Sequence, residues 1–312
     1  MALKIVTAQQ ALQVQNIITV IYGDPGIGKT SLASSASRPI LFDFDLGAHR
    51  AGKFRKDVVQ VTKWQEVASL TADDLSGYDT IIVDTAGRML DCITAYIAET
   101  DKKASRPDGT LQLQGFGKLA NIYKNWLNRL RLMGKDIVLI AHAKEDKKGE
   151  TLIVRPDMTG SSKGELYKAA DQMGYMTIDD SSGKARKLLS FTPSPGWHAK
   201  DSGALGNLAL PDLDQAPDLL ADLLQQIKDH INSLSETQLQ AQQALQAFRD
   251  DCMEAADAEA LNALVKRLDR NHPAYVEMRQ ALMTTAARLP VSLDKAAGAY
   301  VDNAEPAPEA AQ

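Results

Sequence analysis

The most informative segment of the sequence is Ile17-Ile18-Thr19-Val20-Ile21-Tyr22-Gly23-Asp24-Pro25-Gly26-Ile27-Gly28-Lys29-Thr30-Ser31-Leu32. Its first six residues are apolar, aromatic or β-branched, which is typical of a strand buried on both faces. The next eight residues match the pattern G-x-x-x-x-G-K-[ST], and a helix is expected to begin at Lys29. A buried strand, a glycine-rich turn and a helix in this order predict the first unit of an α/β fold.

The glycine-rich loop predicts a site for a nucleoside triphosphate with Mg²⁺. Its glycines let the backbone wrap round the β-phosphate, so that successive N–H groups face the anion. Lys29 is expected to reach the β- and γ-phosphates, and the Thr30 hydroxyl is expected to ligate the metal. The predicted nucleotide-binding residues are Gly23, Asp24, Pro25, Gly26, Ile27, Gly28, Lys29, Thr30 and Ser31.

Short apolar runs alternate with amphipathic segments along the first 212 residues, which predicts a mostly parallel central sheet with crossover helices. Further strands are expected at residues 39–44, 80–84 and 137–141. Helices are expected from Lys29, near Lys63, after Gly87 and at residues 118–133, where Trp126 belongs to a core stripe. Residues 173–178 and 187–192 bracket a turn at 180–183 and predict a hairpin at the sheet edge.

Acidic residues close two of these strands. Asp84 follows an apolar run and is predicted to hold Mg²⁺ together with Thr30. Asp43 and Asp45 stand at alternate positions at the end of a strand, and parallel strands end at the same sheet edge as the glycine-rich loop. One of the two is expected to orient or deprotonate the attacking water; Asp45 is favoured, with Asp43 as the alternative.

One histidine and several basic clusters complete the candidate site. His142 ends the run 137–141, where it is expected to sense the γ-phosphate or couple it to the loop that follows. The predicted catalytic residues are therefore Asp45, Lys29, His142 and Asp43. Basic clusters are either solvated loops or contacts to a polyanion backbone. They comprise Arg50, Lys53, Arg55 and Lys56, then Lys102, Lys103 and Arg106, then Lys144, Lys147 and Lys148.

Composition bounds the class of protein. Hydrophobic residues at 44% and charged residues at 24% are ordinary for a soluble globular chain, and no apolar run approaches the roughly 18 residues of a membrane span. The amino terminus lacks a secretory pattern, so a cytoplasmic location without a membrane partner is expected. Two cysteines far apart, Cys92 and Cys252, predict neither a disulfide framework nor a metal cluster.

Charge and proline divide the chain. Residues 1–212 contain 27 Lys and Arg against 24 Asp and Glu, whereas residues 213–312 contain 8 against 16. This asymmetry argues against a generally basic nucleic-acid binder and favours local basic patches on the first part. The predicted domains are a core at 1–212, an acidic helical domain at 213–298 and a disordered tail at 299–312. Helices of the second domain are expected at about 220–231, 239–252, 261–268 and 274–289, the second entered at Ser235.

The loop 23–30, Asp43-Phe44-Asp45, Asp84 and Ala141-His142 together resemble the RecA-like core ATPases of bacteriophages. In particular, they resemble the single-strand annealing and recombination ATPases of the Sak group, over roughly residues 14–212. This resemblance implies a RecA-like P-loop fold, ATP and Mg²⁺ as cofactors, and ATP hydrolysis. It also implies single-stranded DNA as a partner, a homo-oligomer, and a role in annealing or recombining phage DNA in the host cytoplasm.

The same resemblance implies roles for individual residues. The acid at the Asp45 position activates water, and the polar residue at the His142 position relays the nucleotide state to a DNA-binding loop, here residues 144–153. The segment 198–203 resembles the Lys-x-Arg finger that such proteins insert into a neighbour's site. Ser202 stands where the arginine would be, so Lys200 is the remaining cation of that finger.

Three alternatives remain open at this point. The segment 84–88 matches signal-recognition-type GTPases, although no guanine-specificity motif follows at the later strand ends. A nucleotide-switched assembly or loader protein would instead recruit a single-strand binding or replication protein through the acidic helices. An ordinary phosphotransferase would need a pocket for a small acceptor molecule, for which the sequence contains no motif.

Overall fold

The computed structural model describes residues 5–7, 10–148, 151–158, 162–180, 185–294 and 296–303. It divides into two compact units, Val14–Ile231 and a second made of Met1–Gln13 with Asn232–Gln312. No helix among the described residues is both long enough and apolar enough to cross a bilayer.

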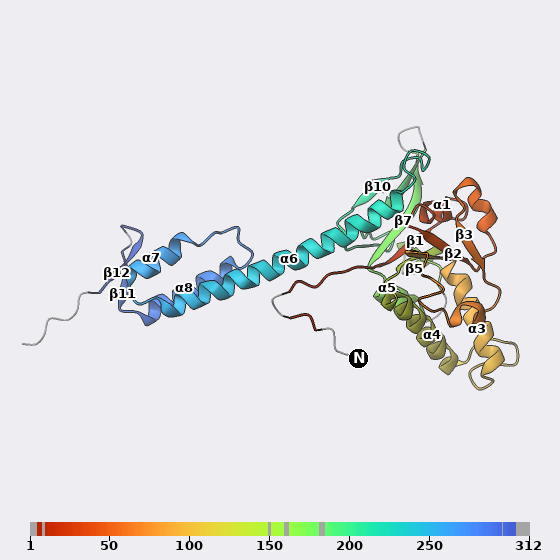
Figure 1. Ribbon diagram of the computed structural model, residues 1–312, viewed down its shortest axis with the longest axis horizontal. Coiled ribbons are helices and arrows are strands. Elements are labelled where there is room, and N and C mark those ends of the chain that lie inside the picture. Colours follow the sequence, from red (N-terminus) through yellow and green to blue (C-terminus); the bar gives the residue numbers. More distant parts are fainter. Residues whose placement is uncertain are drawn as a thin grey trace, which may run out of the picture. The chain divides into compact units, whose positions relative to one another are not determined.

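A mostly parallel sheet forms the centre of the unit Val14–Ile231, as the sequence predicts (Figure 1). Its strands lie in the order β10-β8-β7-β1-β5-β4-β2-β3, and all pairs from β7 to β3 are parallel. The strands are β1 (Ile18–Gly23), β2 (Pro39–Asp43), β3 (Asp57–Gln60), β4 (Thr80–Asp84), β5 (Asp136–Lys148), β7 (Gln172–Asp179), β8 (Arg186–Ser190) and β10 (Asn207–Ala209). Strand β5 separates β1 from β4, and this arrangement confirms the expected RecA-like α/β fold.

Two strands and an edge hairpin complete this sheet. Strand β6 (Thr151–Pro156) pairs with the second half of β5, and β9 (Lys200–Asp201) pairs with β7, both antiparallel. Strands β7 and β8 are antiparallel neighbours, which confirms the predicted hairpin. Residues 181–184, at its predicted turn, lie outside the described residues.

Helices cover both faces of the sheet. They are α1 (Lys29–Ala33), the 3₁₀ segment η1 (Ala48–Phe54), α2 (Gln65–Ala68), α3 (Ala86–Thr100), α4 (Leu113–Leu132) and α5 (Ser162–Ala169). Side chains of β1 alternate between two cores: Ile18 and Val20 join the core under α3 and α4, whereas Ile21, with Ile17 just before the strand, joins the core under α1. Trp126 of α4 is 3% exposed in the first core, as predicted.

One long helix, α6 (Leu219–Glu254), replaces the two helices expected at 220–231 and 239–252. The expectation of a break at Ser235 was wrong because no glycine or proline interrupts the segment, so a polar Ser-Glu-Thr-Gln run continues the helix. The start of α6, including Leu223 and Ile227, packs in the second core of Val14–Ile231. The structure therefore divides at residue 231 rather than at 212.

The second unit has its own small core. Helices α7 (Ala258–Lys266) and α8 (Tyr275–Arg288) correspond to the last two predicted helices. Phe248, Leu261 and Leu282 are buried together in this core. A hairpin of β11 (Val291–Asp294) and β12 (Ala299–Asp302) was not predicted. Strand β11 lies within the expected helical domain, and β12 occupies the start of the expected disordered tail; residues 304–312 lie outside the described residues.

Candidate functional site

The glycine-rich loop leaves the sheet at the end of β1, between β5 and β7. Gly23 lies opposite His142 of β5 and Met176 of β7. A Cβ on Gly23 would stand 2.4 Å from the Met176 carbonyl oxygen, so only glycine permits this approach. Gly28 has φ of 109°, in the left-handed region that favours glycine. Both positions thus need the glycine that the motif supplies.

Lys29 is buried inside the loop, with 5% of its surface exposed. Its Nζ donates hydrogen bonds to the carbonyl oxygens of Gly23 at 3.0 Å and Asp24 at 2.8 Å. Burial lowers the pKa of Lys29, and the nearby carboxylates of Asp84 and Asp24 oppose that shift. The ammonium is therefore held within the loop by neutral acceptors that an anion can replace.

Thr30 of α1 contacts Asp84 at the end of β4. Thr30 Oγ1 donates a hydrogen bond of 2.6 Å to Asp84 Oδ2, at the end of β4. Burial raises the pKa of Asp84, and the charges of Asp43 and Asp45 add to this, whereas the Thr30 hydrogen bond and Lys29 oppose it. A hydroxyl and a carboxylate side by side fit Mg²⁺, which binds one or two protein oxygens together with substrate phosphates. No cluster of three or more His, Cys, Asp or Glu that could hold a metal occurs among the described residues.

Asp43 and Asp45 have different surroundings. Asp43 is 1% exposed, and its carboxylate accepts hydrogen bonds from the backbone N–H groups of Gly47 at 3.0 Å and Ala48 at 2.8 Å. Asp45 lies beyond the end of β2 and faces the loop. Its carboxylate pairs with Arg50 at 3.2 Å and with Arg88 of α3 at 3.5 Å. Asp43 thus fixes the turn that places Asp45 at the site.

His142 lies within β5 rather than at its end, because β5 continues to Lys148. Its Nδ1 is buried and has no hydrogen-bond partner among the described residues. Burial lowers the pKa of His142, and the charge of Lys29 lowers it further, so the imidazole is neutral at neutral pH. A neutral imidazole with a free polar atom can accept or donate one hydrogen bond at this site.

These residues surround one pocket of about 140 Å³. Its lining comprises Gly26, Gly28, Lys29, Thr30, Ser31, Asp45, Gly47, Arg50, Ala51, Asp84 and His142. The structure therefore brings together Lys29, Thr30, Asp84, Asp45 and His142, as the sequence predicts. Arg50 is the residue that sequence reasoning missed, because it was grouped with a basic cluster. The signal for it was its position in the same short turn as Asp45.

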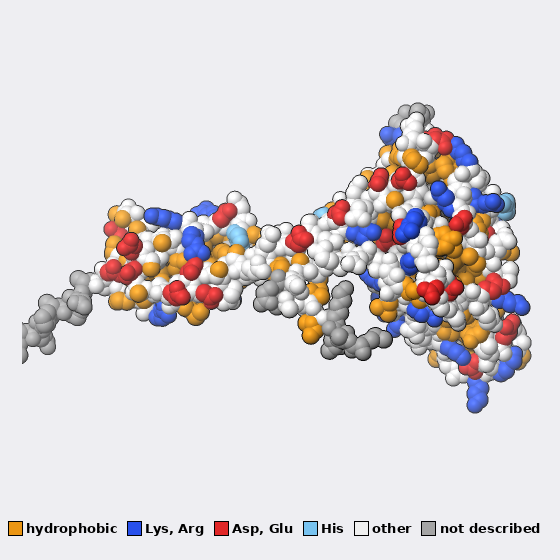
Figure 2. Space-filling view, viewed as in Figure 1, with side chains coloured by type: hydrophobic (Ala, Val, Ile, Leu, Met, Phe, Trp, Pro, Cys, Tyr) orange, Lys and Arg blue, Asp and Glu red, His pale blue; other side chains and the backbone are white. Residues whose placement is uncertain are grey.

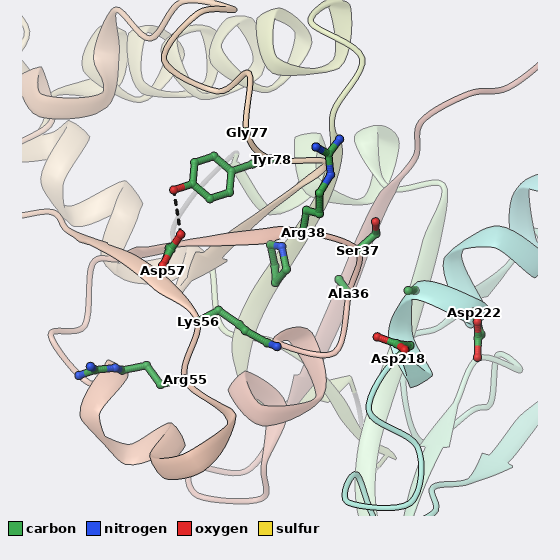
Figure 3. A pocket seen from close by; sticks show the side chains of 12 residues that line it. Ala36, Ser37, Arg38, Arg55, Lys56, Asp57, Gly77, Tyr78, Asp218 and Asp222 are labelled. Atoms are coloured by element: carbon green, nitrogen blue, oxygen red, sulfur yellow. Dashed lines mark hydrogen bonds between the residues drawn. The ribbon is translucent and has the colours of Figure 1, made fainter.

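A second cavity, of about 990 Å³, lies elsewhere (Figure 3). Its lining includes Arg38 and Pro39 before and at the start of β2, and Asp57 and Tyr78 at the starts of neighbouring strands. Tyr78 donates a hydrogen bond of 3.0 Å to Asp57, drawn as the dashed line. Because the strands are parallel, this cavity is at the edge opposite the glycine-rich loop, and none of the predicted nucleotide-binding, catalytic or metal-binding residues lines it.

That cavity also divides the first basic cluster. Arg55 and Lys56 line it, opposite the acidic residues Asp218 and Asp222. Arg50 lies instead in the nucleotide pocket, and Lys53 pairs with Asp214. These four basic residues are close in sequence but do not form one surface.

The predicted DNA loop is an antiparallel ribbon. Lys144, Lys147 and Lys148 lie on β5 beyond His142, opposite β6. Lys144 pairs with Asp157 at 3.5 Å, and Arg155 of β6 pairs with Asp146 at 2.7 Å. On the face drawn in Figure 2, lysine and arginine side chains are interspersed with acidic ones.

Lys102, Arg106 and Lys200 have partners within the chain. Lys102 donates to the Ala98 carbonyl oxygen at 3.0 Å, and Arg106 donates to the Leu111 carbonyl oxygen at 2.9 Å. Lys103 follows Lys102 in the turn after α3 and is exposed. Lys200 Nζ donates to the Ala170 carbonyl oxygen at 2.5 Å. A role for Lys200 in a neighbour's site would require it to leave this contact.

A curated protein and two solved structures are similar to parts of this chain. A curated relative from Bacillus subtilis (strain 168), the SPbeta prophage-derived uncharacterized protein YorG, is 32% identical over 148 residues. The match covers 43% of this chain and 43% of that protein, so it spans less than half of the relative's length. Among solved structures, a KaiC-like protein from Pyrococcus horikoshii OT3 matches with a TM-score of 0.35 and 10% identity, over 65% of this chain and 99% of that chain. The flagellar accessory protein FlaH from Methanocaldococcus jannaschii matches with a TM-score of 0.35 and 11% identity, over 61% and 83%.

A family model described as an AAA domain matches residues 15–202. The matched range contains the glycine-rich loop, Asp45, Asp84 and His142, and it covers more than half of the chain. The chain therefore belongs to the AAA domain family, a family of P-loop ATPases.

Proposed function

We propose that this chain binds ATP with Mg²⁺ in the pocket around Lys29 and hydrolyses it. The observation that carries this proposal is the 2.6 Å contact of the Thr30 hydroxyl with the Asp84 carboxylate, next to the buried Lys29 ammonium. Three groups from two separate strand ends converge where a metal-bound triphosphate needs them. The family assignment and the missing guanine-specificity motif favour ATP over GTP.

Each side chain then has a defined task. Lys29 exchanges the carbonyl oxygens of Gly23 and Asp24 for the β- and γ-phosphates. Thr30 and Asp84 hold Mg²⁺, which neutralises phosphate charge when bound. Asp45 orients the attacking water and accepts its proton, and the neutral His142 offers a hydrogen bond to the γ-phosphate or to that water.

We further propose that the core binds single-stranded DNA as a homo-oligomer and serves annealing or recombination in a phage. The prophage origin of one relative supports the phage setting. The position of the β5–β6 ribbon supports a coupling between the nucleotide site and bound DNA, since Lys144 follows His142 by two residues on the same strand. Because Lys144 pairs with Asp157, DNA contact would exchange this ion pair for a phosphate.

A loader or assembly function is the second candidate. It is favoured by the separate unit of Asn232–Gln312, which has its own core and an acidic composition. Such a unit suits recruitment of a single-strand binding or replication protein. In this case hydrolysis would respond to the protein partner and be indifferent to DNA.

Steady-state hydrolysis by the wild type, with and without single-stranded DNA and with GTP as control, tests these proposals. An ATP-selective rate that rises with DNA supports the DNA function. A rate that DNA leaves unchanged contradicts the proposed DNA function. The absence of any turnover contradicts the proposed hydrolysis as well. Lys200→Ala mixed with a hydrolysis-deficient Asp45→Asn protein tests the trans finger, because only an inserted Lys200 would affect turnover by the neighbour.

A further inference from the structure

Arg50 occupies a place in the nucleotide pocket that the proposed function does not yet use. It lies in η1, five residues after Asp45, and its Nη2 is 3.2 Å from Asp45 Oδ2. The same pocket holds Lys29, Thr30 and Asp84. A guanidinium thus stands among the groups that are expected to receive the triphosphate.

The fold builds this place specifically. A Cβ on Gly47 would stand 2.6 Å from Arg50 Nη2 and 2.7 Å from its Cζ, so the guanidinium lies against the bare Cα of Gly47. The turn itself is fixed, because the buried Asp43 binds the backbone N–H groups of Gly47 and Ala48. Arg50 is therefore directed toward Asp45 by backbone geometry as well as by charge.

A second arginine lets Arg50 move without leaving Asp45 unpaired. Arg88 Nε is 3.5 Å from Asp45 Oδ1, and Arg88 Nη1 also pairs with Asp91 at 3.3 Å. Arg88 belongs to α3 and is absent from the pocket lining, whereas Arg50 is part of it. Of the two guanidiniums, Arg50 is the one that a bound anion can reach.

We infer that Arg50 is an arginine finger supplied in cis, which exchanges the Asp45 carboxylate for the γ-phosphate when ATP binds. This inference rests on the proposed function. A guanidinium binds phosphate oxygens through two parallel N–H groups, and a triphosphate offers more negative charge than one carboxylate. The exchange has two effects: it places positive charge where charge develops during transfer, and it leaves Asp45 open to water.

Hydrolysis forms one bond to the γ-phosphorus and breaks another. The water oxygen bonds to the γ-phosphorus while the bond from that phosphorus to the bridging oxygen breaks, and ADP leaves with the electron pair. One water proton passes to Asp45 and from there to solvent. Arg50 neither gains nor loses a proton, since a guanidinium stays charged throughout.

Equilibrium binding separates contact with the γ-phosphate from other roles of Arg50. ADP and a non-hydrolysable ATP analogue would be titrated, with Mg²⁺, into the full-length wild type, Arg50→Ala and Arg50→Lys. We expect Arg50→Ala to lower the affinity for the ATP analogue about 10- to 100-fold, because charge-assisted hydrogen bonds are lost. The affinity for ADP should stay within about twofold of the wild-type value. Arg50→Lys keeps the positive charge but lacks the two parallel N–H groups of the guanidinium, so its affinity for the analogue should lie between those of the wild type and Arg50→Ala. Arg55→Ala is the matched control, because Arg55 directly follows the same 3₁₀ segment but lines the other cavity.

The same titrations in an Asp45→Asn background exclude an indirect role. If Arg50 acts only by positioning Asp45, its removal has no effect in this background, and the inference is overturned. If it contacts the γ-phosphate, the loss of analogue affinity persists. A wild type that binds neither nucleotide would refute the proposed function itself, whereas a wild type that binds both, with an unchanged preference in Arg50→Ala, would refute this inference alone.

Discussion

Asp43 and Asp45 offer the sharpest test of how the site is built. Asp43 is buried and accepts two backbone N–H groups through its two oxygens. Asparagine keeps one acceptor oxygen and turns an amide toward the other N–H, so at least one hydrogen bond to a charged acceptor is lost. Such a bond contributes about 1.5–3 kcal/mol, and we expect Asp43→Asn to lower the free energy of unfolding by about 2 kcal/mol.

Asp45→Asn should behave in the opposite way. Its carboxylate is 20% exposed, and the guanidiniums of Arg50 and Arg88 are each more than 60% exposed, so these ion pairs contribute less than about 1 kcal/mol. Removal of the group that orients or deprotonates water should instead lower kcat by about 10²- to 10⁴-fold. The pair of variants thus separates a structural carboxylate from a chemical one.

Urea unfolding followed by tryptophan fluorescence measures the first effect, and steady-state turnover measures the second. All three tryptophans lie within Val14–Ile231, so the signal reports the unit that contains the site. Turnover by Asp43→Asn is to be measured without urea, where the variant remains folded. The reasoning is refuted if Asp43→Asn loses turnover at unchanged stability while Asp45→Asn retains it.

Three further predictions concern burial and close packing. Because burial raises the pKa of Asp84, its charged form destabilises the fold above that raised pKa, and the cost disappears as pH falls toward the unfolded-state value of about 3.9. Asp84→Asn should therefore have a higher free energy of unfolding in urea than the wild type at pH 7, and this difference should shrink toward pH 4. The variant should also lose Mg²⁺-dependent turnover. A stability difference that does not change with pH would contradict this reasoning. Tyr123→Phe removes a buried hydroxyl that has no hydrogen-bond partner among the described residues, so it should stabilise the fold by about 1 kcal/mol and leave turnover unchanged. Destabilisation in the same urea titration would show that the hydroxyl has a partner. Gly23→Ala places a Cβ against the Met176 carbonyl oxygen and should cost about 1–3 kcal/mol and weaken nucleotide binding; wild-type affinity would show that the loop tolerates displacement from β7.

Local sequence signals predicted the parts of the fold in which local and long-range preferences agree. The buried strand before Gly23, the strand that ends at Asp84 and the helix that contains Trp126 all follow from short apolar patterns. The convergence of Lys29, Thr30 and Asp84 follows as well, since parallel strands place their carboxyl ends at one edge.

Other features depend on pairing between distant residues, which single-sequence patterns do not contain. The charged run after His142 resembles a loop, yet it forms the second half of β5 because residues 151–156 pair with it. The different roles of Asp43 and Asp45 arise from the turn at Gly47, whose N–H groups select the earlier carboxylate. The position of Arg50 against Gly47 follows from that same turn, so it was not visible from charge alone.

The most direct test of the central claim is equilibrium binding of ATP with Mg²⁺ to the wild type and to Lys29→Ala, with ADP in parallel. We expect saturable binding of both nucleotides to the wild type, dependence of ATP binding on Mg²⁺, and loss of binding in the variant, since Lys29 is the buried cation of the loop. Equal binding by Lys29→Ala, or no binding by the wild type, would contradict the assignment of this pocket to a triphosphate.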